Sequence, residues 1–202
     1  MTKTNNIENL AKHIGVTFSD MSLLRAACTH RSYLNENPEQ SLEDNERLEF
    51  LGDSVLNLAV SDLLYQRLSL MAEGELSRIR ANLVKQETLH QLSVELGLPA
   101  CIRLGEGEMR SGGQKRPSIL ADALEALIGA VYLDAGYPAA QSLVARLFKD
   151  VKVNPQMQAA AKDPKTELQE WLQGRKLQLP LYTVVATRGA AHKQMFEVAC
   201  DI

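Results

Sequence analysis

Residues 45–56 read NERLEFLGDSVL, and the rest of the chain is organised around this stretch. Read as an α-helix at about 100° per residue, it gathers its apolar side chains on one side, which we expect to be buried. Those side chains are Leu48, Leu51, Val55 and Leu58. Glu46, Glu49 and Asp53 fall together near the opposite side. Because like charges at this spacing repel, the pattern indicates either a cation among the carboxylates or an ordinary solvated acidic face.

Phe50 is out of place on this helix. It falls near the acidic side, where a phenyl ring in a single chain has no obvious apolar neighbours. Exposed apolar side chains in such a setting are typical of contacts between chains. We therefore expect Phe50 to contact a second protein chain.

Residues 118–134 read SILADALEALIGAVYLD and form the second informative stretch. Between Ser118 and Asp134 the only charged residues are Asp122 and Glu125, so the pattern predicts a helix that is buried on most sides. Burying two ionised carboxylates is costly unless they are paired or bind a metal ion. The two alternatives are therefore salt bridges to Arg or Lys, and a metal site shared with the first acidic helix.

The two predicted helices can build that metal site together. If they pack face to face, four carboxylates converge: Glu49, Asp53, Asp122 and Glu125. An all-oxygen ligand set suits Mg²⁺ or Mn²⁺ and not zinc. Neither helix carries a histidine beside its acids, which argues against a di-iron centre. Metal ions held by carboxylates favour phosphodiester hydrolysis as the chemistry.

Composition places the chain among cytosolic proteins. It has 202 residues, enough for one domain and a small module, and 45% of them are hydrophobic. The net charge of −3 does not favour nucleic-acid binding. Three cysteines, without a CxxC pair, are typical of reduced thiols. The sequence has neither a secretory signal nor a run long enough to span a bilayer, so we expect a cytoplasmic protein that does not associate with membranes.

Two other segments of the first part of the chain are predicted to lack regular structure. Residues 29–40 read THRSYLNENPEQ and have no periodicity, so we expect a loop. His30 and Arg31 could contact phosphate there, although a lone histidine more often makes local hydrogen bonds. Residues 103–118, with four basic residues and four glycines, are expected to be flexible. Such a segment could hold a polyanion beside the acidic site, or be a surface connector.

The sequence changes character after residue 152. We expect a helical domain at 1–152, a linker at 153–163 and a second module at 164–202. In the module, residues 166–173 are predicted to form a helix, and two segments rich in β-formers follow. One helix and two strands cannot make a stable module alone, so we expect this domain to be incomplete at its C-terminus.

At these motifs the chain resembles the bacterial ribonuclease III family. NERLEFLGDSVL is similar to the family signature, and SILADALEALIGAVYLD is similar to its second catalytic helix. KDPKTELQEWLQGR, followed by two strands, resembles the start of a double-stranded-RNA-binding domain. The resemblance implies a mainly α fold, in which an all-helical endonuclease domain precedes a small α+β RNA-binding domain.

The resemblance also implies an activity. It is that of a homodimeric endoribonuclease, active in rRNA and mRNA processing, that cuts both strands of double-stranded RNA. The products would have 5′-phosphate and 3′-hydroxyl ends with short 3′ overhangs. The cofactor would be Mg²⁺, for which Mn²⁺ could substitute.

Residue roles follow from motif position. The implied metal ligands are Glu49, Asp53, Asp122 and Glu125, of which Asp53 and Glu125 would be catalytic. Glu46 and Glu73 would be secondary acids near the valley between subunits, and Phe50 would insert into the partner subunit. The implied RNA-binding residues are Thr166, Gln169, Glu170 and His192.

Two other functions compete with this interpretation. A non-catalytic RNA-binding or scaffold protein of the same fold would have lost metal carboxylates, and here all four are present. A phosphohydrolase acting on small molecules would have no use for a duplex-binding module. The chain departs from the family in ending before the third strand and last helix of that module, which implies weaker RNA binding.

Overall fold

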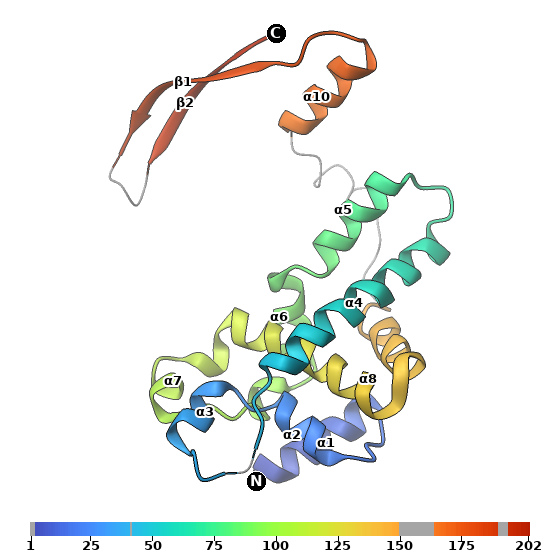
Figure 1. The fold of residues 1–202 in the computed structure, drawn as a ribbon, viewed down its shortest axis with the longest axis vertical. Coiled ribbons are helices and arrows are strands. Elements are labelled where there is room, and N and C mark those ends of the chain that lie inside the picture. The colour runs from blue at the N-terminus through green and yellow to red at the C-terminus, as the bar shows by residue number, and fades with distance from the viewer. Residues whose placement is uncertain (1–2, 41, 150–163, 190–193) are drawn as a thin grey trace. The chain divides into compact units, whose positions relative to one another are not determined.

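The computed structural model describes residues 3–40, 42–149, 164–189 and 194–202 (Figure 1). The chain divides into two compact units, Met1–Asn154 and Pro155–Ile202. The whole of the predicted linker, residues 153–163, lies outside the described residues. Its boundaries therefore stay a prediction.

The first unit is helical throughout. Its α-helices are α1 (Lys3–Ile14), α2 (Met21–Ala27), α3 (Arg31–Glu36), α4 (Glu46–Arg67), α5 (Glu73–Leu83), α6 (Gln86–Glu95), α7 (Glu106–Arg110) and α8 (Pro117–Leu147). Short 3₁₀ turns at Leu98–Ala100 and Gly113–Lys115 precede and follow α7. The core lies along α8, which is buried almost continuously from residue 119 to residue 131.

α4 and α8 touch backbone to backbone. A Cβ atom added to Gly52 of α4 would lie 1.8 Å from the carbonyl oxygen of Glu125. A Cβ atom added to Gly129 of α8 would lie 2.4 Å from the carbonyl oxygen of Leu48. No side chain fits at either position. The two glycines therefore set how closely the two helices carrying the acidic residues approach.

α8 consists of two helical segments joined at a kink. Between them Gly136 has φ 77° and ψ 175°, which breaks the helical geometry, and Pro138 follows. A positive φ is readily available to glycine because it has no side chain. Just before this kink, Asp134 accepts hydrogen bonds from the backbone N–H groups of Ser19 (2.9 Å) and Asp20 (2.7 Å). This contact ties α8 to the start of α2.

The predicted loop at residues 29–40 contains a helix, α3. His30 is its N-cap, and the imidazole Nδ1 accepts from the N–H of Ser32 at 3.2 Å. The expectation that His30 makes a local hydrogen bond is thus confirmed, and the expectation of a loop throughout is wrong. A capping imidazole starts this short helix without any periodic apolar pattern.

The predicted flexible segment at 103–118 is also partly helical. The carboxylate of Glu36 accepts from the N–H groups of Glu106 (2.6 Å) and Gly107 (3.2 Å), at the first turn of α7. Ser32 Oγ accepts from the N–H of Gly105 at 3.0 Å. These bonds cap α7 from a segment about seventy residues earlier. Local sequence carries no signal for such a cap.

The second unit contains α10 (Pro164–Gly174) and an antiparallel pair of strands, β1 (Leu181–Arg188) and β2 (Met195–Asp201). Tyr182 pairs with Cys200, and the register shifts at a bulge between Val184 and Ala186. With the helical first unit, this order confirms the predicted fold class: a mainly α protein with a small C-terminal α+β module.

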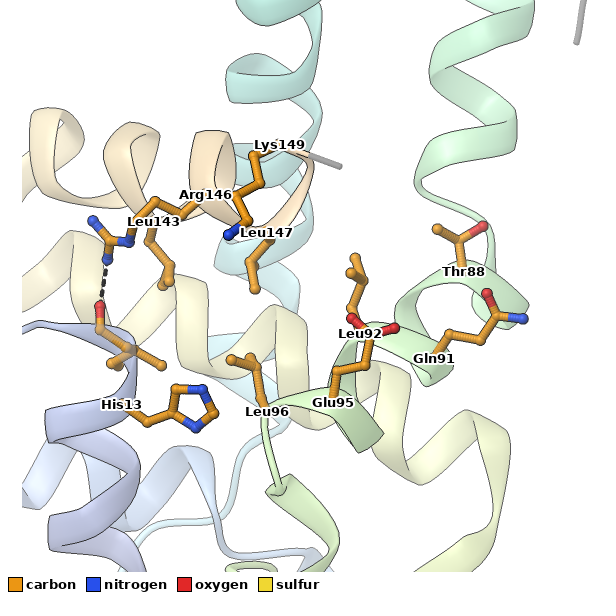
Figure 2. Close-up of a pocket in the computed structure, with 11 residues that line it drawn as sticks. His13, Thr88, Gln91, Leu92, Glu95, Leu96, Leu143, Arg146, Leu147 and Lys149 are labelled. Atoms are coloured by element: carbon orange, nitrogen blue, oxygen red, sulfur yellow. Dashed lines mark hydrogen bonds between the residues drawn. The ribbon is translucent and has the colours of Figure 1, made fainter. Parts of the chain in front are cut away.

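A pocket of about 510 Å³ lies in the first unit between the end of α1, α6 and the end of α8 (Figure 2). Four leucines line it: Leu92, Leu96, Leu143 and Leu147. His13 and Glu95 also line it, and Arg146 donates a hydrogen bond to the carbonyl oxygen of Ile14. Glu95 is its single acidic residue among those described, so this pocket does not provide a carboxylate cluster.

Other expectations concern membranes and thiols. None of the helices in the described ranges has both the length and the apolar content needed to cross a bilayer.

Cys28 and Cys101 are buried free thiols, and Cys200 is an exposed one. Free thiols agree with the reduced state expected from cysteine spacing.

Replacing Gly52 by alanine should destabilise the first unit. The new Cβ would meet main-chain atoms of α8, so the helices would have to separate, at a cost of about 1–3 kcal/mol or more. Urea unfolding followed by circular dichroism measures the change. The matched control is Gly74→Ala on α5, where the nearest atom is the flexible end of Arg78 at 3.7 Å. Equal stability of the two variants would contradict the proposed role of Gly52.

Candidate metal centre

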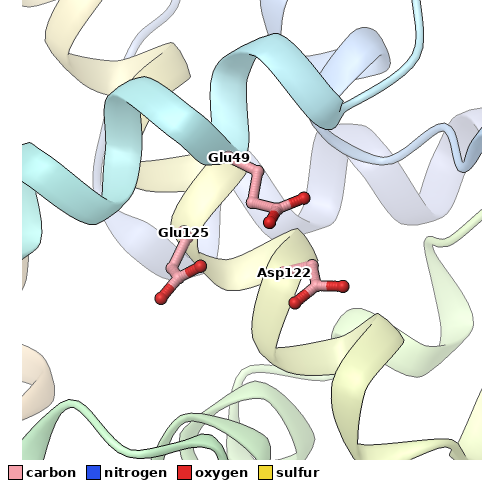
Figure 3. Close-up of side chains that lie close together, drawn as sticks. All are labelled: Glu49, Asp122 and Glu125. Carbon is pink, nitrogen blue, oxygen red and sulfur yellow. The ribbon is translucent and has the colours of Figure 1, made fainter.

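Three carboxylates meet where α4 and α8 touch (Figure 3). Glu49 comes from α4, and Asp122 and Glu125 come from α8. One oxygen of each lies within 4.8 Å of the others, and all three side chains are partly buried. Figure 3 shows the three carboxylates converging between the two helices. Oxygen atoms this close can bind a single cation together.

The glycine contact explains this convergence. Glu49 lies three residues before Gly52 on α4, and Glu125 lies four residues before Gly129 on α8. Residues three or four apart share a face of a helix, so each glutamate is adjacent to the contact point. A larger residue at either glycine would move the acidic side chains apart.

The cluster is electrostatically unfavourable on its own. Burial, followed by the charges of Asp53 and Asp122, raises the pKa of Glu125 to about 8. Burial and then the charge of Asp122 raise the pKa of Glu49 above its ordinary value. Burial likewise raises the pKa of Asp122, and His30 opposes this increase. The cluster therefore favours a proton or a cation among its oxygens.

Salt bridges do not account for these buried acids. Across the described ranges, no Lys or Arg forms an ion pair with Glu49, Asp122 or Glu125. Uncompensated carboxylate oxygens are the ligands that hard divalent cations prefer. The donor set fits Mg²⁺ or Mn²⁺.

Asp53, the fourth expected ligand, is not in this group of three. It is exposed on α4, and its Oδ1 accepts from the amide of Asn57 at 2.8 Å. It is nevertheless near the cluster, because its charge contributes to the raised pKa of both Glu49 and Glu125. Sequence spacing predicts Asp53 on this face and does not reveal its bond to Asn57.

The remaining acidic and aromatic candidates of the first unit lie outside the cluster. Glu46 is exposed and pairs with Arg31 at 3.1 Å. Glu73, at the start of α5, accepts from the hydroxyl of Ser77 at 2.8 Å. Phe50 is 80% exposed on α4. Within one chain, therefore, Phe50 has the exposed position expected of a residue that contacts a partner.

The structure locates the side chains of two of the four residues expected to bind RNA in the second unit. Gln169 is partly buried and Glu170 is exposed, both on α10. The side chain of Thr166 and the whole of His192 lie outside the described part of the structure. Just after this helix, the guanidinium of Arg175 stacks on Trp171 of α10, 3.9 Å from the ring centroid.

Sequence reasoning missed part of the surroundings of the cluster. A pocket next to it is lined by Glu49 and Asp122 and also by Asn45, Glu108 and Arg116. Asn45 and Glu108 gave no signal in the sequence because their position depends on how α3, α7 and α8 pack. Arg116 belongs to the basic segment at residues 103–118, and the sequence does not indicate which neighbours its side chain has.

Comparison with known proteins gives consistent matches. The sequence profile of the family described as Ribonuclease-III-like matches residues 20–151. Ribonuclease 3 of Albidiferax ferrireducens is 66% identical over 198 residues, which is 98% of this chain and 84% of that protein. Ribonuclease 3 of Variovorax paradoxus is 65% identical over 193 residues, covering 96% of this chain and 82% of that protein.

Solved structures agree with these sequence matches. The nuclease domain of ribonuclease III from Campylobacter jejuni superposes with a TM-score of 0.67 at 40% identity, covering 74% of this chain and 97% of that one. A second structure of that domain, described for flexibility in a region involved in dimer formation, gives a TM-score of 0.66 at 41% identity. It covers 71% of this chain and 96% of that one.

Stability without metal should depend on pH through Glu125. Its folded-state pKa of about 8 lies above the ordinary value of 4.5, so the folded chain holds the proton more tightly. The stability that this proton contributes is fully present below pH 4.5 and is lost as the pH rises towards 8. Glu125→Gln cannot lose a proton, so its free energy of unfolding should fall less over this range.

Urea unfolding in EDTA across that pH range measures the difference. The matched control is Glu95→Gln on α6, an exposed glutamate outside the cluster. Its free energy of unfolding should change with pH as that of the native chain does. If the stability of Glu125→Gln fell with pH as steeply as that of the native chain, deprotonation of Glu125 would not be the cause of the loss.

Proposed function

This chain belongs to the ribonuclease III family of double-stranded-RNA endoribonucleases, and on that premise we propose that its carboxylate cluster holds the Mg²⁺ ion used for RNA cleavage. One observation carries the proposal: oxygens of three partly buried carboxylates from α4 and α8 lie within 4.8 Å of one another, and in the described ranges none of the three forms an ion pair with Lys or Arg. Mn²⁺ has similar ligand preferences and should substitute.

Glu49, Asp122 and Glu125 would hold the ion, and Asp53 would join them by releasing Asn57. A divalent cation bound by carboxylates activates water and neutralises charge on the phosphate during in-line displacement. Asp53 and Glu125 would help to hold the ion beside the phosphate. Cleavage of this kind would leave 5′-phosphate and 3′-hydroxyl ends, with short 3′ overhangs when both strands are cut.

The second unit would bind the RNA duplex. Gln169 and Glu170 are neighbours on α10, and we assign them, with Thr166, to the minor groove. His192, in the segment between β1 and β2, would reach a neighbouring groove. A-form RNA exposes its 2′-hydroxyl groups in a wide, shallow minor groove, so recognition would depend on shape more than on base sequence. Processing of rRNA and mRNA in the cytoplasm fits such a substrate.

The active form would be a homodimer joined through α4. Phe50, Leu58 and Tyr65 are exposed by 80%, 56% and 75%, and they lie within about 80° of one another around the helix. The expectation that Leu58 is buried with the other apolar side chains of this helix is therefore wrong. A row of exposed apolar side chains on one side of a helix is typical of a protein interface. Glu46 and Glu73, apart from the cluster within one chain, would then line the valley between the two subunits.

Glu125→Gln should abolish cleavage while leaving the fold and the dimer intact. The substitution removes one metal-binding charge and keeps nearly the same shape. The measurement is cleavage of a long RNA duplex with Mg²⁺ on a denaturing gel, with circular dichroism and sedimentation as checks. Glu95→Gln is the control and should cut normally. Cleavage by the Glu125→Gln chain at the native rate would refute the assignment of the metal site.

Phe50→Asp should weaken dimerisation. A charged carboxylate in place of an apolar ring would have to be buried at the interface, which is unfavourable. Sedimentation velocity over a range of protein concentrations measures the change. Val94→Asp is the control, because Val94 is also an exposed apolar residue, 51% exposed, on α6. A dimer of native strength in Phe50→Asp would show that this ring does not contact the partner.

A further inference from the structure

A second pocket adjoins the carboxylate cluster, and its volume is about 330 Å³. We call it the arginine pocket, after Arg31 at the start of α3 and Arg116 just before α8, which line it together with Asn45. Glu49 and Asp122 belong both to this pocket and to the cluster. A group bound in the arginine pocket would therefore lie immediately beside the metal centre.

Both arginines are held by acidic side chains. Arg31 pairs with Glu46 at 3.1 Å, and Arg116 pairs with Glu108 at 2.7 Å. Arg116 also donates to the hydroxyl of Ser111 at 3.2 Å. These contacts keep two guanidinium groups beside the pocket and leave part of each exposed, 65% for Arg31 and 44% for Arg116. Guanidinium groups arranged in this way can bind phosphate through paired hydrogen bonds.

Asn45 is the unexplained polar group in this pocket. It is only 4% exposed, yet across the described ranges its side-chain amide makes no hydrogen bond. Its backbone is fully used, because the N–H donates to Thr29 and the carbonyl accepts from Glu49. The amide atoms are not fully enclosed by protein, so they are accessible from the pocket that Asn45 lines. They are therefore available to a ligand with polar oxygen atoms.

Because of the charges in the pocket, binding of such a ligand would depend on a bound metal ion. Its described lining contains four acidic residues and two arginines. Glu46 and Glu108 are balanced by the arginines, which leaves the charges of Glu49 and Asp122. A divalent cation on those two carboxylates would cancel them. An anion would then enter without facing excess negative charge.

Building on the function proposed above, we propose that Arg31, Asn45 and Arg116 bind the backbone phosphate next to the cleaved bond on the same RNA strand, after metal has bound to the cluster. The shared residues Glu49 and Asp122 place the two phosphates side by side. Arg116 moves from Glu108 to the phosphate, so Glu108 competes with RNA for this guanidinium.

RNA binding by non-cleaving chains tests the proposal. All variants carry Glu125→Gln, and fluorescence anisotropy with a short RNA duplex at saturating Mg²⁺ gives the affinity. Arg116→Gln should weaken binding roughly ten-fold, as expected for one charged hydrogen-bonding contact. It should also reduce the slope of log affinity against log salt concentration by about 0.9, the value for one phosphate contact. In EDTA the effect of Arg116→Gln should be smaller.

Matched variants separate phosphate binding from a structural role. Arg110→Gln, which removes an exposed arginine that pairs with Glu106 outside the pocket, should bind as the parent does. Arg116→Lys should recover the salt slope. Glu108→Gln should bind RNA at least as tightly as the parent, because it removes the competitor for Arg116. If Glu108→Gln weakened binding as much as Arg116→Gln, their ion pair would be merely structural and the proposal would fail.

Two further measurements identify the source of any negative result. Displacement of the duplex by inorganic phosphate from the parent, but not from Arg116→Gln, would assign the pocket to a small anion and contradict the proposal. Cleavage by chains that retain Glu125 tests the enzyme separately. A chain that cuts duplex RNA, and whose affinity for RNA does not respond to Arg116→Gln, would refute this inference alone. Absence of cleavage would refute the proposed function.

Discussion

The structure depends on one close approach, the contact between α4 and α8 at Gly52 and Gly129. At both positions a Cβ atom would overlap main-chain atoms of the other helix. The backbones can meet only because the two side chains are missing. Packing at this distance brings Glu49 within reach of Asp122 and Glu125. The glycines are thus as necessary to the site as the acids, although they bind nothing.

The same contact groups the carboxylates that could bind a metal ion, and this grouping lowers the stability of the metal-free protein. Burial is the largest cause of the raised pKa of Glu49, Asp122 and Glu125, and the charges of neighbouring carboxylates raise the pKa further for Glu49 and Glu125. A helical protein would gain stability by replacing them with apolar residues. A cation bound as proposed above would convert their mutual repulsion into affinity for metal. Folding and metal binding should therefore be coupled in this protein.

The sequence was informative for the long helices, in which a periodic apolar pattern is combined with acidic residues. A helix at residues 45–56, the burial of α8 and the grouping of Glu49 with Asp122 and Glu125 follow from spacing and composition. It failed where distant residues determine local structure: Glu36 caps α7, and His30 starts α3. It likewise could not show that Asp53 bonds Asn57, or that buried Asn45 faces a pocket. These features arise from side-chain geometry after packing, which no local pattern records.

The central claim is that the carboxylates at the α4–α8 contact hold a divalent cation. Its most direct test is X-ray diffraction from crystals grown with Mn²⁺, with anomalous scattering recorded at the manganese absorption edge. The account predicts an anomalous peak bounded by the carboxylate oxygens of Glu49, Asp122 and Glu125. Manganese bound only elsewhere, with these three carboxylates paired to lysine or arginine side chains, would contradict it.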